Sequence, residues 1–167
     1  MTDTEKNLHV AFAGESQANR RYIFFAEKAQ KEGHSQIARL FRAAAEAETI
    51  HARNHFNAMD GIGSTRDNLT AGVIGEHREF TGMYPSFIEQ ARIDDYKRAE
   101  RTFDLANQVE EVHYNLFQEA LKALESEQEI KDEPVFVCQV CGYTVAGEAP
   151  EKCPVCGAPA KSFTRVE

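Results

Sequence analysis

Two Glu-x-x-His pairs, Glu48 with His51 and Glu110 with His113, constrain this chain more than any other feature of its sequence. Residues three apart in a helix stand one turn apart on the same face, so each pair can offer a carboxylate and an imidazole to one metal ion. About one such pair is expected by chance in a Glu-rich chain with six His. What the rest of the chain places opposite the pairs therefore decides their meaning.

Four helical patterns cover most of the first 126 residues. The apolar periodicity predicts helices over 5–32, 35–59, 68–92 and 94–126. Thr4, Ser35 and either Asp67 or Asn68 are the expected N-terminal caps, and Gly33 ends the first helix. Pro85 is expected to kink or restart the third helix near Tyr84.

Each of these helices carries a Glu near the middle of its apolar stripe. The four are Glu15, Glu48, Glu76 and Glu110, and Glu79 flanks the third stripe one turn after Glu76. A carboxylate on a core face is costly unless it is paired or coordinates a metal. For Glu15, the alternative is a slightly rotated stripe that leaves this residue at its edge. His55 shares the second stripe, but a single His there is more often a hydrogen-bonded core residue than a ligand.

All four cysteines lie near the C-terminus in two Cys-x-x-Cys pairs, each followed by Gly. They are Cys138, Cys141, Cys153 and Cys156. Two such knuckles in a segment of about 33 residues predict a tetrathiolate metal site, because a domain this small needs a staple. Tetrahedral sulfur coordination suits iron and zinc equally.

Composition narrows the function classes. The net charge of −8 argues against a nucleic-acid partner or an anionic membrane surface and leaves metal cations plausible. The chain has no apolar run long enough to cross a bilayer, and its polar N-terminus is unlike a signal peptide. Paired thiols suit a reducing compartment, so a cytoplasmic location is expected. The expected organisation is a helical domain over 1–128, a charged linker over 129–134 and a cysteine domain over 135–167.

Taken together, the carboxylates and histidines match a known arrangement. Ferritin-like di-metal bundles use one Glu from each of two helices and Glu-x-x-His from each of the other two. The predicted fold class is therefore mainly α, a ferritin-like four-helix bundle followed by a small rubredoxin-like metal domain of β-strands and knuckles.

Over nearly its whole length the chain resembles the rubrerythrin family. The resemblance rests on residues 11–18 (AFAGESQA), 48–51 (ETIH), 75–79 (GEHRE) with 83–85 (MYP), 110–113 (EEVH), and the two cysteine knuckles. It implies that two irons are bound by Glu15, Glu48, Glu76, Glu79, Glu110, His51 and His113, and that a third is bound by the four Cys. Zinc is the alternative at the cysteines. Glu79 separates this family from ferritins, which lack that carboxylate.

The resemblance also implies an activity. The diferrous site would reduce hydrogen peroxide to water and would be re-reduced through the cysteine-bound iron, with electrons from a redox donor such as rubredoxin or a reductase. One iron would exchange His51 for Glu79 on oxidation, because a ferric ion gains more from an added carboxylate. Tyr22 and Tyr84 resemble the family's tyrosines near the site, although Tyr22 could equally be a core residue.

The connection between the second and third helices bears on assembly. In a ferritin-like bundle these helices run parallel, so residues 60–68 must recover about 28 Å at ~1.5 Å per helical residue. Nine residues span at most about 30 Å when fully extended. We therefore expect a homodimer, with the first two helices of one chain swapped against the last two of the other.

Two further functions compete with the peroxidase. A ferroxidase or iron-handling protein shares the fold but needs neither Glu79 nor a one-electron tail. A non-catalytic zinc-ribbon bundle would bind zinc at the cysteines and pair its inner carboxylates with cations.

Overall fold

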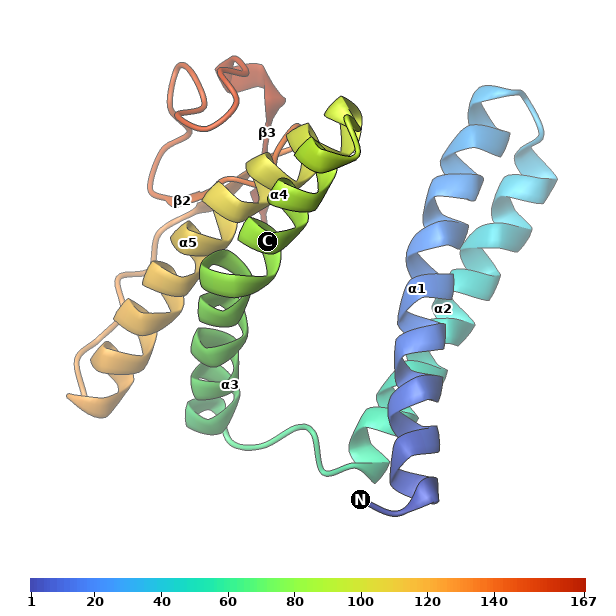
Figure 1. Ribbon diagram of the computed structural model, residues 1–167, viewed down its shortest axis with the longest axis horizontal. Coiled ribbons are helices and arrows are strands. Elements are labelled where there is room, and N and C mark those ends of the chain that lie inside the picture. The colour runs from blue at the N-terminus through green and yellow to red at the C-terminus, as the bar shows by residue number, and fades with distance from the viewer. The chain divides into compact units, whose positions relative to one another are not determined.

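The first two helices form a hairpin that opens the chain. The computed structural model describes all 167 residues in two compact units, Met1–Gly63 and Ser64–Glu167 (Figure 1). In the first unit, α1 (Asp3–Lys31) is capped by Thr2, whose side chain accepts a hydrogen bond from the Glu5 N–H. The Glu5 carboxylate caps Thr2 in return, which completes a capping box. The expected cap at Thr4 is wrong, because Thr4 already lies in the first turn.

The second helix, α2 (Ser35–Ala58), also begins differently from the expectation. Its N-cap position is His34, which makes no capping hydrogen bond through its side chain, and Ser35 is already helical. The turn between the helices depends on Gly33, whose φ of +83° is a left-handed conformation that other residues rarely adopt.

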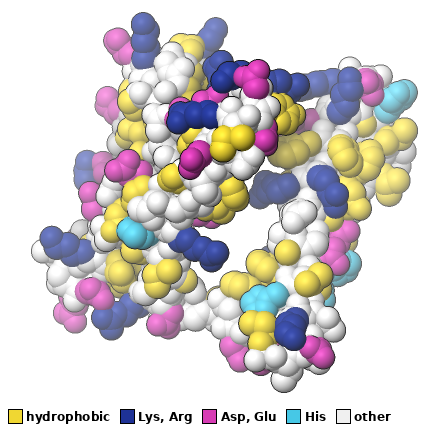
Figure 2. Space-filling view, viewed as in Figure 1, with side chains coloured by type: hydrophobic (Ala, Val, Ile, Leu, Met, Phe, Trp, Pro, Cys, Tyr) yellow, Lys and Arg dark blue, Asp and Glu magenta, His cyan; other side chains and the backbone are white.

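Small and aromatic side chains hold this hairpin together. Ala residues form the buried contacts between α1 and α2, while the Phe12 and Phe56 rings stack with centroids 4.7 Å apart. Asn19 links the helices further, because its Nδ2 donates to the Ala45 carbonyl at 2.7 Å and to Thr49 Oγ1 at 2.9 Å. Larger apolar side chains such as Phe24 and Leu40 remain exposed, at 59% and 69%. Hydrophobic side chains accordingly cover much of the visible surface of both helical hairpins (Figure 2).

Gly61, just after α2, provides a test of this packing. A β-carbon at this position would overlap the Phe56 ring. We expect Gly61→Ala to lower the free energy of unfolding by about 1–3 kcal/mol, because the ring must move from its stack on Phe12. Urea unfolding of the metal-free protein, followed by circular dichroism, measures the change. An unchanged midpoint would mean that Phe56 moves aside without cost.

The second unit begins with a long helix that changes character halfway. Ser64 caps α3 (Thr65–Arg78) through a capping box with Asp67, so the expected caps at Asp67 or Asn68 are wrong. A π-helical turn (Glu79–Met83) follows, in which the Tyr84 N–H bonds to the Glu79 carbonyl five residues back. The turn precedes Pro85, which lacks an N–H and would crowd the carbonyl four residues earlier in an α-helix. The expected restart near Tyr84 is confirmed, since α4 (Tyr84–Ile93) begins there.

The last helix pairs with this broken one, and the cysteine segment follows it. α5 (Lys97–Glu125) starts three residues later than expected, because Asp95 has a φ of +50° that interrupts the chain between α4 and α5. Beyond it, β1 (Val135–Cys138) lies between β2 (Thr144–Ala146) and β3 (Phe163–Val166) in an antiparallel sheet.

The expected fold class, mainly α with a small C-terminal cysteine domain, is confirmed. None of the helices is both long enough and apolar enough to cross a bilayer. The helices instead carry polar and ligand-bearing residues along their length.

Candidate metal centres

One cluster of donor groups lies within the α1–α2 hairpin. Glu15 comes from α1, while Glu48 and His51 come from consecutive turns of α2, and their donor atoms lie within 4.8 Å of one another. His51 Nδ1 is 2.8 Å from Glu48 Oε2. We call these residues the α1–α2 cluster. The Asn19 hydrogen bonds lie next to it and fix how α1 and α2 face each other at this level.

A matching cluster lies within the α3–α5 pair. Glu76 comes from α3, while Glu110 and His113 come from consecutive turns of α5, with donor atoms again within 4.8 Å. His113 Nδ1 is 2.8 Å from Glu110 Oε2, the same geometry as in the first cluster. We call these residues the α3–α5 cluster. The structure therefore places six of the seven expected bundle ligands in two similar groups.

The α3–α5 cluster gathers more negative charge than its surroundings can balance. Burial, and then the charge of Glu110, raises the pKa of Glu76 to about 7. Burial and the same Glu110 charge raise the pKa of Glu79. The hydrogen bond to Glu110 raises the pKa of His113, which favours its charged form. Carboxylates that hold protons because they lie beside one another are suited to exchange those protons for a metal cation.

The remaining expected residues lie in two different settings. Glu79 lies beside the α3–α5 cluster but outside its 4.8 Å group, at the first position of the π-helical turn. Tyr84 lies at the other end of that turn, where burial and then the charge of Glu110 raise the pKa of its hydroxyl. Tyr22 packs against Phe25 and Phe41 in the α1–α2 hairpin, with ring centroids 6.4 and 6.1 Å away.

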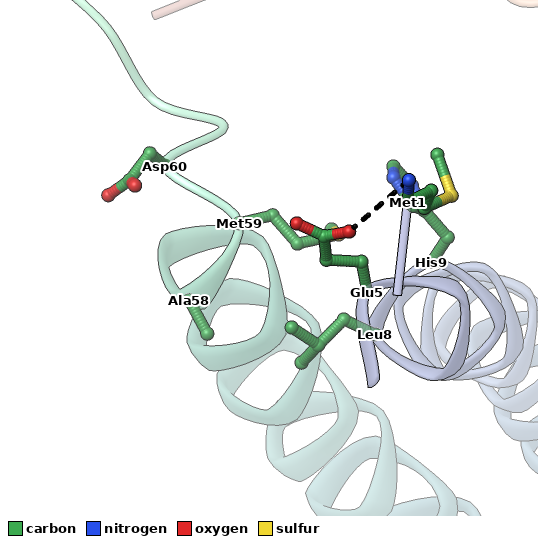
Figure 3. Close-up of a pocket in the computed structure, with 7 residues that line it drawn as sticks. All are labelled: Met1, Glu5, Leu8, His9, Ala58, Met59 and Asp60. Carbon is green, nitrogen blue, oxygen red and sulfur yellow. Dashed lines mark ion pairs between the residues drawn. The ribbon is translucent and has the colours of Figure 1, made fainter. Parts of the chain in front are cut away.

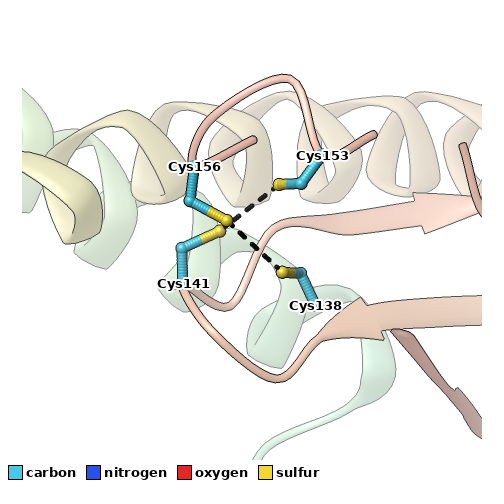
Figure 4. Close-up of side chains that lie close together, drawn as sticks. All are labelled: Cys138, Cys141, Cys153 and Cys156. Atoms are coloured by element: carbon cyan, nitrogen blue, oxygen red, sulfur yellow. Dashed lines mark hydrogen bonds between the residues drawn. The ribbon is translucent and has the colours of Figure 1, made fainter. Parts of the chain in front are cut away.

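The four cysteines converge on one point in the tail (Figure 4). Cys138 Sγ is 3.7 Å from Cys156 Sγ, and Cys141 Sγ is 3.5 Å from Cys153 Sγ. Disulfide sulfurs lie at ~2.05 Å, so these thiols are not bonded to each other. Ligands ~2.3 Å from a tetrahedral ion stand about 3.8 Å apart, which fits the observed spacing.

Backbone N–H groups of the two knuckles point at these sulfurs. Burial acts to raise the pKa of Cys153, but the N–H groups of Cys156 and Val155 outweigh it and lower that pKa to about 7. Gly142 and Gly157 have φ values of +89° and +74°, which the tight turns require. The knuckles thus stabilise thiolates, the form of cysteine that binds metal.

The donor sets fit metal ions of the expected kinds. A single ion about 2.1 Å from each ligand atom joins atoms up to about 4.2 Å apart, so small side-chain rotations close either helical cluster around one ion. Carboxylates with imidazole suit iron, and four thiolates suit a rubredoxin-type iron or zinc.

The sequence did not reveal one contact between these centres. His113 Nε2 lies 3.0 Å from Thr144 Oγ1 at the start of β2. The two residues are 31 positions apart, and a single Thr after a knuckle has no distinguishing pattern. Only the packing of the tail on α5 makes this contact visible.

A surface pocket lies away from the α1–α2 cluster, at the open end of that hairpin. It is lined by Met1, Glu5, Leu8, His9, Ala58, Met59 and Asp60, and its one ion pair joins the Met1 amino group to Glu5 at 3.9 Å (Figure 3). The lining does not include the three residues of the cluster.

Comparison with known proteins covers both parts of the chain. The rubrerythrin family model matches residues 6–121, and the model of the rubrerythrin rubredoxin-like domain matches residues 136–164. The chain belongs to the rubrerythrin family. Rubrerythrin-2 of Clostridium acetobutylicum is 39% identical over 93% of this chain and 92% of its own length. Rubrerythrin of Nitratidesulfovibrio vulgaris is 38% identical over 96% of this chain and 92% of its own length.

Solved structures agree with the family membership. The fully reduced, all-ferrous state of nigerythrin matches with a TM-score of 0.58 and 34% identity, covering 98% of this chain and 86% of that chain. The expected ferritin-like and rubredoxin-like fold is thereby confirmed. The family and the two kinds of donor set support a di-iron protein of the oxidoreductase class with a rubredoxin-type iron site.

Proposed function

We propose that this protein is a non-haem di-iron peroxidase that reduces hydrogen peroxide to water and receives electrons through its cysteine-bound iron. The observation that carries the proposal is the presence, in one chain, of two matching Glu, Glu and His clusters and a tetrathiolate knuckle site. A redox donor such as rubredoxin or a reductase would supply the electrons, in a reducing compartment such as the cytoplasm.

The metal sites supply the redox chemistry: two ferrous ions provide the two electrons that, with two protons, convert hydrogen peroxide to two waters, and the tail iron replaces those electrons singly. The protein residues hold and adjust these sites. Glu15, Glu48, Glu76 and Glu110 supply the carboxylates that hold two cations close together, and His51 and His113 complete the ligand set.

Two residues beside the α3–α5 cluster have separate proposed roles. Glu79 is a reserve carboxylate that replaces His51 when the charge of the site increases, and its place in the wider π-helical turn gives it room outside the cluster. Tyr84 presents a hydroxyl whose proton is held firmly, because burial and the nearby carboxylates raise its pKa. It can therefore donate a hydrogen bond to a peroxide oxygen. Tyr22 is assigned a supporting role only, since it packs among phenylalanines.

The observed helix ends strengthen the case for a swapped dimer. Glu48 lies ten residues before the end of α2, and Glu76 lies eleven residues after the start of α3. At ~1.5 Å per residue, a connection within one ferritin-like bundle must recover about 31 Å. Only residues 59–64 connect the helices, and the seven steps from Ala58 to Thr65 reach about 25 Å when fully extended. The connection is too short.

We therefore propose that each di-iron site combines the α1–α2 cluster of one chain with the α3–α5 cluster of a second copy. The exposed apolar side chains on both hairpins, such as Leu40 and Ile74, provide surfaces for this pairing. In this organisation residues 1–128 form the swapped bundle, 129–134 the linker and 135–167 the rubredoxin-like domain.

Ferroxidase or iron-handling activity is the alternative function, favoured by the shared fold. The presence of a one-electron tail and of Glu79 favours the peroxidase instead.

Metal analysis and rapid kinetics test the proposal. We expect about three irons per chain pair of clusters and tail site, and stopped-flow mixing of the reduced protein with hydrogen peroxide should oxidise the bundle irons faster than mixing with oxygen. Faster oxidation by oxygen would support the ferroxidase. Zinc in the tail with no peroxide-dependent oxidation would contradict the peroxidase.

A further inference from the structure

The rubredoxin-like domain touches the di-iron half of its own chain at one point. β2 begins at Thr144, next to the first knuckle, and packs against α5. A β-carbon on Gly142 would lie 3.6 Å from a Val109 methyl, so the knuckle backbone rests directly on this helix. Val109 is one of the few buried large side chains of the molecule, at 3% exposure. The contact is therefore close-packed.

A chain of hydrogen bonds runs through this contact. Glu110 Oε2 lies 2.8 Å from His113 Nδ1, on the metal-facing side of the imidazole. On the other side, His113 Nε2 lies 3.0 Å from Thr144 Oγ1. The Thr144 hydroxyl donates to the Gly142 carbonyl at 3.0 Å, and Gly142 is bonded to Cys141. If Nδ1 binds the metal, Nε2 carries the proton and donates to Thr144.

Physical chemistry gives this arrangement a definite consequence. A metal-bound histidine is fixed in tautomer and orientation by the hydrogen bond that its second ring nitrogen makes. Here the acceptor belongs to the domain that holds the other metal. The Gly142 carbonyl also lies close enough to contribute to the raised pKa of His113, so it is the one competing acceptor from the knuckle.

We propose that Thr144 is a positioning residue that fixes the His113 imidazole and connects it, through the Gly142 peptide, to the cysteine knuckle. The electron route would then run from the Cys141 side of the tail site to the bundle within one chain. In the transfer, a ferrous tail iron becomes ferric and a ferric bundle iron becomes ferrous. The kinetic part of this inference rests on the proposed peroxidase function, whereas the structural part does not.

The first test needs no redox activity. The protein is loaded with zinc in place of iron, labelled with ¹⁵N-histidine and studied by NMR, with His113 assigned from a His113→Gln variant. We expect a slowly exchanging Nε2–H signal in the wild type and in Thr144→Ser. In Thr144→Val, which keeps the shape but loses the hydroxyl, this signal should exchange rapidly. A protected signal in Thr144→Val would mean that the Gly142 carbonyl alone orients the ring, and would overturn the proposal.

The second test follows electron transfer in the iron-loaded protein. After oxidation by peroxide, the visible absorption of the tail iron reports its rate of reoxidation. We expect Thr144→Val to slow this step roughly 10-fold or more, and Thr144→Ser to retain most of the rate. Thr164→Val, an exposed substitution in β3, is the matched control. An unchanged rate in Thr144→Val would overturn the route, whereas absence of peroxide oxidation in the wild type would contradict the peroxidase and leave the NMR result standing.

Discussion

Two inactive variants are expected to restore each other's activity when they share a dimer. The first, Glu48→Ala with His51→Ala, destroys the α1–α2 cluster, and the second, Glu110→Ala with His113→Ala, destroys the α3–α5 cluster. In a swapped dimer of the two, one site receives both damaged halves and the other receives both intact halves. The mixed dimer should therefore bind about half of the wild-type bundle iron and retain about half of its peroxide turnover.

The experiment requires co-expression with two different affinity tags and sequential purification, so that only mixed dimers are measured. Each homodimer serves as its own control and should lack both bundle iron and turnover. In an unswapped dimer every site would lack one cluster, and the mixed dimer would be as inactive as its parents. Tail iron, measured by its visible absorption, should be normal in all three and confirms that the proteins are folded.

Glu79→Ala is expected to abolish most peroxide turnover while leaving the fold and the tail iron intact. Glu79 lies beside the α3–α5 cluster without belonging to it, so its loss removes the reserve ligand but not the cluster itself. We expect turnover to fall by roughly 10-fold or more, in line with the loss of groups that tune a metal site. Stopped-flow oxidation by peroxide and iron analysis measure the two properties separately.

The matched control is Glu111→Ala, which removes an exposed carboxylate from α5 next to Glu110. This variant should keep its turnover. Thermal unfolding of the metal-free proteins adds a check, because removing Glu79 also removes repulsion from the cluster and should not destabilise it. Normal turnover in Glu79→Ala would argue against the ligand role.

The sequence was sufficient for the ligand-bearing faces, because the physics that selects them is local. A Glu three residues before a His fixes their common face in any helix, and cysteine knuckles need only short spacing and a following Gly. The two clusters and the cysteine site therefore lie where the spacing predicted. Their assignment as iron ligands stays a prediction until metal is measured.

Helix ends and long-range contacts were harder. Thr2 and Thr4 are equally good caps by residue type, and only the reciprocal bond from Glu5 favours Thr2. Ser64 wins over Asp67 for the same reason, because Asp67 is needed as its partner. Pro85 announced a disturbance in the third helix, but not that it would take the form of a π-helical turn starting at Glu79. The contact between His113 and Thr144 depends on docking of the tail, which no local pattern encodes.

The π-helical turn makes the third helix sensitive to length rather than to composition. It holds one residue more than an α-helical turn, and the helix continues on both sides. Deletion of a single residue there, such as Thr81, could leave a continuous α-helix with its backbone fully bonded. Everything after the deletion would nevertheless turn by ~100° about the helix axis, carrying Tyr84 away from the carboxylates. An ordinary, well-formed helix would then be the defect.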